Sequence, residues 1–325
     1  MHSSTVTDGL VLGWSLTAGI VPGPPVGPAR FAGTVTSMAE LEWHWRPEPG
    51  GPPRHGGPIL IAAFGGWNDA GDAATTVVEH LETIWDTQAF ARIDPEGFHD
   101  FTDSRPQVRL IDDHRVIRWP SHTFSWADLS GTDGVVLLRA VEPQLRWRTY
   151  CDLVLELADE LGCGLVVTLG ALLADVPHTR PSRVLGTAYD PQVAERLRLE
   201  PSTYQGPTGI VGVLHTACLD AGVDSASIWA TVPAYLPSAP APLAALALLE
   251  RVAPLIGVSA EPGELQESIE GYEQAIDQMI EDDDSTVEYV RRLEAEFDAD
   301  PPPGREVGVD PGDLVEEVER FLRDQ

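Results

Sequence analysis

Two short polar stretches of this sequence carry the side chains that are best suited to chemistry. The first spans residues 66–72 and reads GWNDAGD, and the second spans residues 175–183 and reads DVPHTRPSR. Each follows a continuous apolar run, so each is predicted to leave the carboxyl end of a buried strand. Ligands of open α/β sheets bind at that edge, which makes both stretches candidate sites.

A pocket that combined these stretches would offer aromatic faces, carboxylates and a histidine–arginine loop, the groups that a nucleoside-like or amide ligand needs. In an enzyme, His178 would be the general acid or base, Arg180 would hold an anion through paired hydrogen bonds, and Asp69 would orient a donor. A third stretch, YQGPTG at residues 204–209, would add a tyrosine. The candidate ligand-binding or motif residues are Gly66, Trp67, Asn68, Asp69, Asp72, His178, Thr179, Arg180, Tyr204 and Gly206.

The same residues also have structural interpretations. Asn68, Asp69 or Asp72 can accept hydrogen bonds from the first free amides of the helix that is predicted to follow them. His178 and Arg180 can pair with nearby carboxylates and so fix their own loop. The sequence leaves both interpretations open.

The charge of the first stretch limits its chemistry. A helix amino end attracts anions, but two carboxylates beside it would repel them, so a phosphate cradle is disfavoured. Asp69 and Asp72 supply only two metal ligands with no third in the pattern, so neither a metal nor a cofactor is predicted. Trp67 favours a binding role, because a large aromatic side chain on a turn is costly to expose.

The composition excludes several classes of function. A formal charge of −30 would be repelled by nucleic acids and anionic membranes. The sequence has no lysine, which excludes Walker P-loops, protein kinases and Schiff-base enzymes. Its three cysteines show neither metal spacing nor a disulfide framework. With no signal peptide and no membrane-spanning run in the pattern, we expect a cytoplasmic protein.

Alternating strands and helices must position the two polar stretches. Continuous apolar runs predict buried strands, and amphipathic stripes between them predict helices, which together indicate right-handed βαβ units with helices on both sheet faces. A separate alternating pattern at residues 107–119 predicts a β-hairpin with polar turn residues. The predicted strands are residues 59–64, 134–140, 164–169 and 226–236, and the predicted helices follow residues 69, 142, 209 and 242.

The two ends of the sequence differ from this central part. Residues 1–37 are rich in Gly, Pro, Ser and Thr and are expected to be disordered or a mis-assigned start. Residues 38–258 form the expected α/β domain. Residues 259–325 are expected to be an acidic helical extension, with a helical hairpin and a terminal helix near residues 314–322.

Four separated motifs together resemble one family, the actinobacterial branch of the PAC2 family, which is named for proteasome assembly chaperone 2. They read GWNDAGDA at residues 66–73, VPHTRP at 176–181, YQGPTGI at 204–210 and SIWATVPAY at 227–235. The resemblance runs over residues 58–257. It implies a phosphorylase-like, three-layer α/β core with a mostly parallel sheet, a C-terminal helical extension, and a homo-oligomer in the cytoplasm.

The sequence departs from the family pattern in two places. The resemblance predicts a histidine where the chain has Ala234, so chemistry that needs a histidine there cannot operate. Proteins that dock on proteasome rings often end in a hydrophobic residue, a tyrosine and one more, whereas this chain ends FLRDQ. Docking through the tail is therefore not expected.

Two functions follow from these patterns. The first is a non-catalytic, proteasome-assembly-chaperone-like interaction protein that acts as a homo-oligomer, with proteasome subunits as its further candidate partners. The alternative is a small-ligand-binding protein or enzyme, with a nucleoside-like or amide-like substrate held in the pocket around Trp67 and His178.

Overall fold

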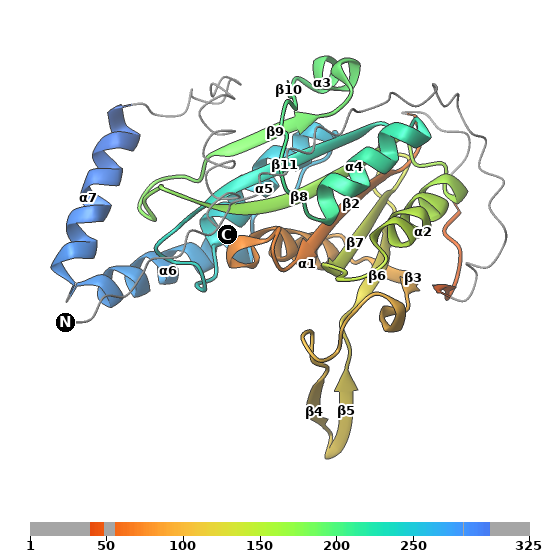
Figure 1. The fold of residues 1–325 in the computed structure, drawn as a ribbon, viewed down its shortest axis with the longest axis horizontal. Coiled ribbons are helices and arrows are strands. Elements are labelled where there is room, and N and C mark those ends of the chain that lie inside the picture. The colour runs from red at the N-terminus through yellow and green to blue at the C-terminus, as the bar shows by residue number, and fades with distance from the viewer. Residues whose placement is uncertain (1–39, 49–55, 282, 300–325) are drawn as a thin grey trace, which may run out of the picture. The chain divides into compact units, whose positions relative to one another are not determined.

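A nine-stranded sheet forms the centre of the protein. The computed structural model describes residues 40–48, 56–281 and 283–299, and the strand order of the sheet is β1-β3-β6-β7-β2-β8-β11-β9-β10 (Figure 1). The strands are β1 (Leu41–Trp43), β2 (Ile59–Gly65), β3 (Gln88–Ile93), β6 (His122–Ala127), β7 (Val135–Val141), β8 (Leu165–Ala174), β9 (Val184–Ala188), β10 (Glu200–Pro201) and β11 (Ser225–Pro233).

The sheet is parallel at its centre and mixed toward its edges. Strands β7, β2, β8 and β11 run parallel to one another. Antiparallel pairs add β6, β3 and β1 on one side and β9 on the other. The parallel strands are the four continuous apolar runs of the sequence, so that prediction is confirmed. The antiparallel strands were not predicted, because they are short and partly polar.

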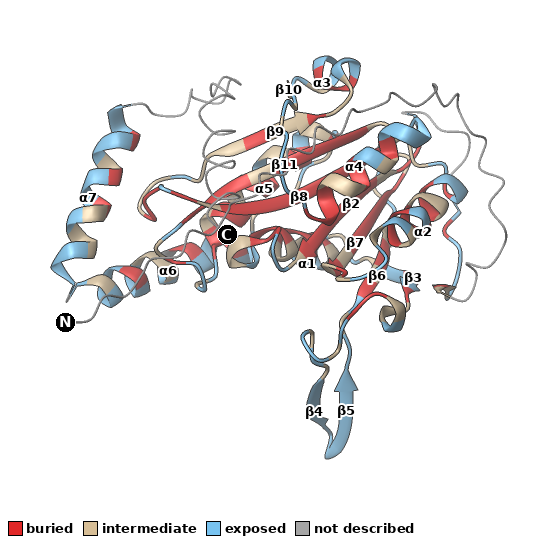
Figure 2. Cartoon of the chain, in the orientation of Figure 1, coloured by how far each residue is buried: buried red, intermediate tan, exposed pale blue. Residues whose placement is uncertain are grey.

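Helices cover both faces of the sheet and give the predicted three-layer α/β fold. Side chains alternate along a strand, so Ile61 and Ala63 pack with α1 and α5, whereas Leu60, Ala62 and Phe64 pack with α2 and α4. Figure 2 shows the resulting buried band along the central strands. The helices around the sheet are α1 (Ala73–Ile84), α2 (Trp147–Glu160), α3 (Pro191–Leu197), α4 (Ile210–Ala221) and α5 (Pro242–Leu255).

Two further helices, α6 (Glu264–Ile280) and α7 (Asp284–Ala299), confirm the predicted acidic helices, but Figure 1 shows α7 at a steep angle to α6, so the two do not fold back on each other as the predicted hairpin. Most of their apolar stripe is buried, but Met279 is 60% exposed, and Leu265 belongs to the same hydrophobic cluster as α1 and α5. The stripe therefore packs at least in part on the main domain. The expectations for residues 1–37 and for the terminal helix lie outside the described residues.

Strands β4 (Gln107–Ile111) and β5 (His114–Arg118) form the predicted hairpin as a separate two-stranded sheet. Asp112 and Asp113 make its turn with φ angles of 48° and 63°, the positive values that a type I′ hairpin turn requires. Figure 1 shows the hairpin projecting away from the nine-stranded sheet. Within the described residues, no helix is both long enough and apolar enough to cross a membrane.

Candidate functional site

The first polar stretch forms a tight turn between β2 and α1. Gly66 has a φ of 123°, a backbone angle that only glycine adopts readily, and the short 3-10 turn Ala70–Asp72 follows before α1 begins. Asp69 caps α1: its carboxylate accepts from the backbone N–H of Ala74 at 2.6 Å and of Thr75 at 3.1 Å, and from the Thr75 hydroxyl at 2.5 Å. The capping role expected of this stretch therefore falls on Asp69.

Neither neighbouring candidate caps the helix, which corrects that part of the structural interpretation. Asp72 has left-handed backbone angles and no side-chain capping bond. The Asn68 side chain turns away from α1 and donates to Glu142 Oε1 at 2.7 Å. The same Glu142 oxygen accepts from the backbone N–H of Ile210 at 2.9 Å, at the start of α4. Glu142 thus joins the turn to a second helix, a contact that the sequence did not suggest.

The buried carboxyl of Asp69 has an altered acidity. The residue is 4% exposed, and burial raises the pKa of its carboxyl to about 6, although three hydrogen bonds act in the opposite direction. Burial dominates because a charge loses its hydration shell inside the protein. Asp69 therefore takes up a proton in mildly acidic solution, while its capping bonds hold the turn in place.

Trp67 lies at the mouth of an aromatic cavity of about 130 Å³ beside this turn. The indole is 42% exposed, so one side of it stays open to solvent. Tyr204 lines the same cavity and fixes its own loop by donating to the carbonyl of Pro207 at 2.6 Å. None of the side chains that line this cavity is acidic or basic apart from His215. The aromatic and imidazole rings around it are Trp67, Tyr189, Tyr204, His215 and Trp229.

Three rings of this cavity, Tyr189, His215 on α4 and Trp229, are absent from the site residues predicted from the sequence, and His215 is the titratable imidazole among them. Its Nε2 lies 2.8 Å from the Thr168 hydroxyl and its Nδ1 lies 2.8 Å from the Ser225 hydroxyl. Burial lowers the pKa of the imidazole to about 4, so the ring is neutral near pH 7. A single histidine on the apolar side of a helix gives no distinctive sequence signal, because most such residues are buried in a hydrogen-bonded core position.

A second, acidic cavity of about 350 Å³ lies on the other side of the turn. Asp69 and Asp72 line it together with Gly66, and Trp67 borders both cavities. Within the described residues, no group of three histidine, cysteine or carboxylate side chains is arranged to hold a metal ion.

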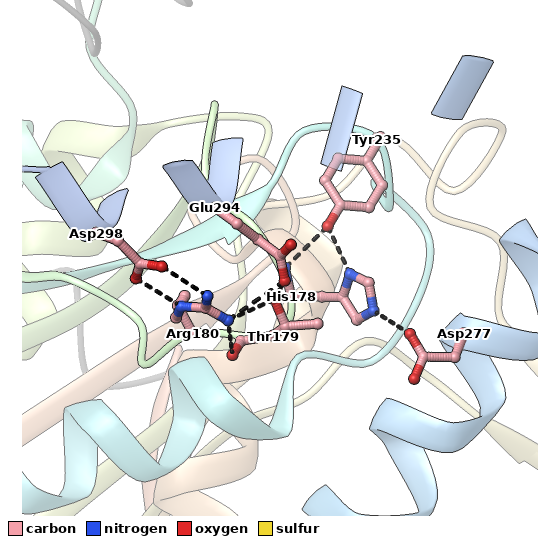
Figure 3. Close-up of polar contacts among 7 residues, drawn as sticks. All are labelled: His178, Thr179, Arg180, Tyr235, Asp277, Glu294 and Asp298. Carbon is pink, nitrogen blue, oxygen red and sulfur yellow. Dashed lines mark hydrogen bonds and ion pairs between the residues drawn. The ribbon is translucent and has the colours of Figure 1, made fainter. Parts of the chain in front are cut away.

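The second polar stretch has a different environment, because its side chains pair with α6 and α7 (Figure 3). The His178 ring is fully buried, and its two nitrogens lie 2.7 Å from the Tyr235 hydroxyl and 3.2 Å from Asp277 Oδ1. The same hydroxyl accepts from the backbone N–H of His178 at 2.8 Å. Both ring nitrogens therefore have a partner within the same chain.

Thr179 and Arg180 continue this network toward α7. The Thr179 hydroxyl donates to Glu294 at 2.5 Å, and the Arg180 guanidinium holds both oxygens of Asp298 at 2.8 Å. Arg180 also lies 3.3 Å from Glu294. These bonds lower the pKa of Asp298 and raise that of Arg180, because each group stabilises the charged form of the other. Tyr289 of α7 adds a bond to Asp175 at 2.7 Å.

The structure therefore divides the predicted site residues into two groups. Gly66, Trp67, Asn68, Asp69, Asp72 and Tyr204 surround the two cavities at the β2 turn, and Gly206 approaches the Tyr204 hydroxyl. His178, Thr179 and Arg180 instead bond to the helical extension. The structural interpretation of His178 and Arg180, pairing with carboxylates, matches these contacts. The carboxylates come from far along the chain.

Comparison with known proteins gives consistent matches. The model of the PAC2 family matches residues 63–280. A PAC2 family protein from Streptomyces avermitilis is 47% identical, with a TM-score of 0.66, covering 72% of this chain and 99% of that one. A proteasome-assembly chaperone homologue from Mycobacterium tuberculosis is 42% identical, with a TM-score of 0.64, covering 71% of this chain and 99% of that one. No curated protein matches the sequence.

A third solved structure extends the likeness in fold. A Mycobacterium tuberculosis protein of unknown function is 26% identical, with a TM-score of 0.74. The match covers 88% of this chain and 96% of that one.

Proposed function

Because this chain belongs to the PAC2 family, we propose that it is a non-catalytic, proteasome-assembly-chaperone-like interaction protein that acts as a homo-oligomer in the cytoplasm. The observation that carries the proposal is the 42% identity to the Mycobacterium tuberculosis proteasome-assembly chaperone homologue, which extends over 99% of that protein. Proteasome subunits are the proposed partners. Residues 38–258 would be the family core and residues 259–325 its helical extension.

The contacts of the His178 loop support a non-catalytic role. The histidine and the arginine that could do acid–base and anion chemistry are already bonded to α6 and α7. A general base must reach its substrate, and the His178 ring is fully buried with a partner from the same chain on each nitrogen. These residues thus serve to hold the helical extension against the core.

Native mass spectrometry of the full chain, alone and mixed separately with proteasome α subunits and with β subunits from the same organism, tests the proposal. A monomer has a mass of 35.1 kDa, so an oligomer and a mixed complex are both distinguished by mass. We expect the chain alone to give a homo-oligomer and at least one of the mixtures to give an additional stoichiometric complex. A chain that binds neither α nor β subunits would refute the proposed partner.

Small-ligand binding is the second candidate function, and the aromatic cavity beside Trp67 is the observation that favours it. A cavity of about 130 Å³ is close in size to the roughly 150 Å³ engineered cavity that binds benzene. With its neutral imidazole and aromatic lining, it suits an uncharged single ring, such as the base or amide portion of a larger ligand. His178 is not part of this cavity lining.

Retention of a small-molecule mass in the native spectra would support this second candidate. The matched test compares the wild-type protein with Trp229→Leu, which changes an aromatic lining side chain, and with Leu219→Ala, which lies exposed on α4 away from the cavity lining. A ligand of the cavity would be lost only from Trp229→Leu. Equal retention by both variants would place the small molecule elsewhere.

A further inference from the structure

The β4–β5 hairpin exposes an apolar surface that the described part of the chain does not cover. All ten residues of its two strands are exposed, and an isolated two-stranded hairpin is only marginally stable in water. Large apolar side chains exposed together in this way mark interaction sites on soluble proteins. The most exposed of them are Val108 at 59%, Leu110 at 67% and Ile117 at 52%.

The strand register shows that these three side chains share one face. Val108 lies opposite Ile117, and Leu110 lies opposite Arg115. Residues that are directly opposite in an antiparallel pair project to the same side, and residues two apart along a strand do so as well. We call Val108, Leu110, Arg115 and Ile117 face A. Face B carries the alternate residues, including Arg109, which lies opposite Val116, and Arg118, which lies opposite Gln107, so two of the three strand arginines lie on face B and one, Arg115, on face A.

The charge of the hairpin is opposite to that of the rest of the chain. Residues 105–118 contain four arginines and two aspartates, whereas the whole chain has a formal charge of −30. The most contrasting stretch is residues 264–299, where thirteen acidic residues accompany two arginines. Its exposed carboxylates include Glu267, Glu281 and Glu288. Face A contributes one of these arginines, Arg115, and a cationic group on an apolar face complements an acidic helical pair, as the partners of a specific interface need to do.

We propose that face A of the hairpin docks on the acidic α6–α7 pair of a second copy of this chain. The inference rests on the proposed function, because it assigns the surface through which the proposed homo-oligomer forms. Docking removes the apolar side chains of face A from water, and Arg115 then meets carboxylates of the neighbouring subunit. The contact is head to tail, so repeating it closes a ring or extends a chain of subunits.

Two charge-reversal variants test the assignment, measured by sedimentation velocity and native mass spectrometry of the full chain without any partner protein. Arg115→Glu reverses a charge on face A. Arg109→Glu makes the same change on face B of the same hairpin and is the matched control. We expect Arg115→Glu to raise the dissociation constant of the oligomer at least tenfold, and Arg109→Glu to raise it less than threefold.

The apolar side chains of face A need a separate test. A charge reversal can weaken association through long-range electrostatics even where the changed residue makes no direct contact. Replacing Val108, Leu110 and Ile117 together by serine is expected to give the 35.1 kDa monomer while the circular dichroism of the core stays unchanged. An unchanged oligomer in this variant or in Arg115→Glu would overturn the proposal. Equal weakening by both charge reversals would also overturn it, because the face would then not matter.

A photocrosslinking amino acid at position 110 identifies the surface that face A touches. Mixing 14N-labelled and 15N-labelled chains separates crosslinks between copies from those within one copy. Crosslinks between copies at residues 264–299 are the expected result, and crosslinks confined to other regions would contradict the assignment to α6–α7.

Two outcomes distinguish a failure of the docking proposal from a failure of the proposed binding to proteasome subunits. A wild-type protein that stays monomeric at high concentration would refute both the docking and the homo-oligomer, but would leave binding to proteasome subunits intact. Hairpin variants that keep the homo-oligomer but lose binding to α subunits would assign the hairpin to the proteasome and overturn self-docking.

Discussion

The Trp67 turn and the His178 loop both follow parallel strands of one sheet, but their side chains differ in whether they bond to distant parts of the chain. In the His178 loop, the side chains of His178, Thr179 and Arg180 bond to residues of the helical extension and, for His178, also to Tyr235. At the Trp67 turn, Asp69 caps a helix, while the aromatic side chains line a cavity. The His178 loop joins the core to the helical extension, whereas the Trp67 turn borders a cavity.

This difference shows that residue type alone does not identify a binding site. Histidine, arginine and threonine in the sequence VPHTRP are as suitable for a ligand as tryptophan and tyrosine near the β2 turn. What separates the two regions is whether partners from elsewhere in the chain satisfy the side chains. Mutations in the His178 loop are therefore expected to change the stability of the protein, and mutations around Trp67 are expected to change ligand binding.

The largest expected effect is that of His178→Ala. The change removes a fully buried ring and leaves the Tyr235 hydroxyl without one of its partners, which is expected to lower the free energy of unfolding by about 2–4 kcal/mol. Urea denaturation measures it, with His44→Ala as the control, because His44 is exposed. A loss as small as that of the control would mean that the His178 contacts do not hold the fold.

The next largest expected effect is a pH dependence of the free energy of unfolding that comes from Asp69. Because burial raises the pKa of Asp69 to about 6, the native state keeps a proton between pH 4 and 6 that the unfolded chain releases. Asp69 therefore makes the free energy of unfolding fall as the pH rises over that range, by up to about 3 kcal/mol. Subtracting the stability of Asp69→Asn from that of the wild type at each pH isolates the effect, and a flat difference would contradict it.

Arg180→Met is expected to loosen α7 with a smaller effect on the whole domain. It removes the paired bonds to Asp298 and the contact with Glu294. Trypsin cleavage at Arg291 and Arg292 should become several-fold faster. Arg196→Met is the control, because it breaks a similar ion pair, with Asp224, away from α7. Equal cleavage rates in the two variants would show that Arg180 does not anchor the helix.

The smallest expected change in stability is that of Trp67→Ala. The side chain is 42% exposed, so its loss is expected to shift the free energy of unfolding by no more than about 0.5 kcal/mol. Thermal and urea denaturation both measure the shift. A loss above 1 kcal/mol would place Trp67 among the residues that hold the fold, and the contrast between the two regions would then weaken.

Local sequence patterns predicted the strand–turn–helix unit around Trp67 well. The apolar run, the glycine pair and the capping carboxylate all lie within about twenty residues, so the forces that shape the unit are visible in one window. The parallel core, the isolated β4–β5 hairpin and the acidic helical pair were predicted for the same reason. The order of the strands and the antiparallel edges depend on contacts between distant segments, which no single window contains.

The bonding partners of the second polar stretch could not be predicted, because they are distant in sequence. Asp277, Glu294 and Asp298 lie 99, 115 and 118 positions from the residues they bind. Tyr235 lies 57 positions from His178, next to Ala234, where the family pattern predicts a histidine, so no local pattern indicates its bond to the His178 ring. The Tyr235 hydroxyl is nevertheless the group that holds His178 in place.

Hydrogen exchange followed by mass spectrometry most directly tests the claim that the His178 loop anchors the helical pair while the Trp67 turn stands apart from that role. The wild type, His178→Ala and Trp67→Ala are compared on peptides from α6 and α7. The account predicts at least tenfold faster exchange in these peptides for His178→Ala and an unchanged rate for Trp67→Ala. Unchanged exchange in His178→Ala, or equal acceleration in both variants, would contradict it.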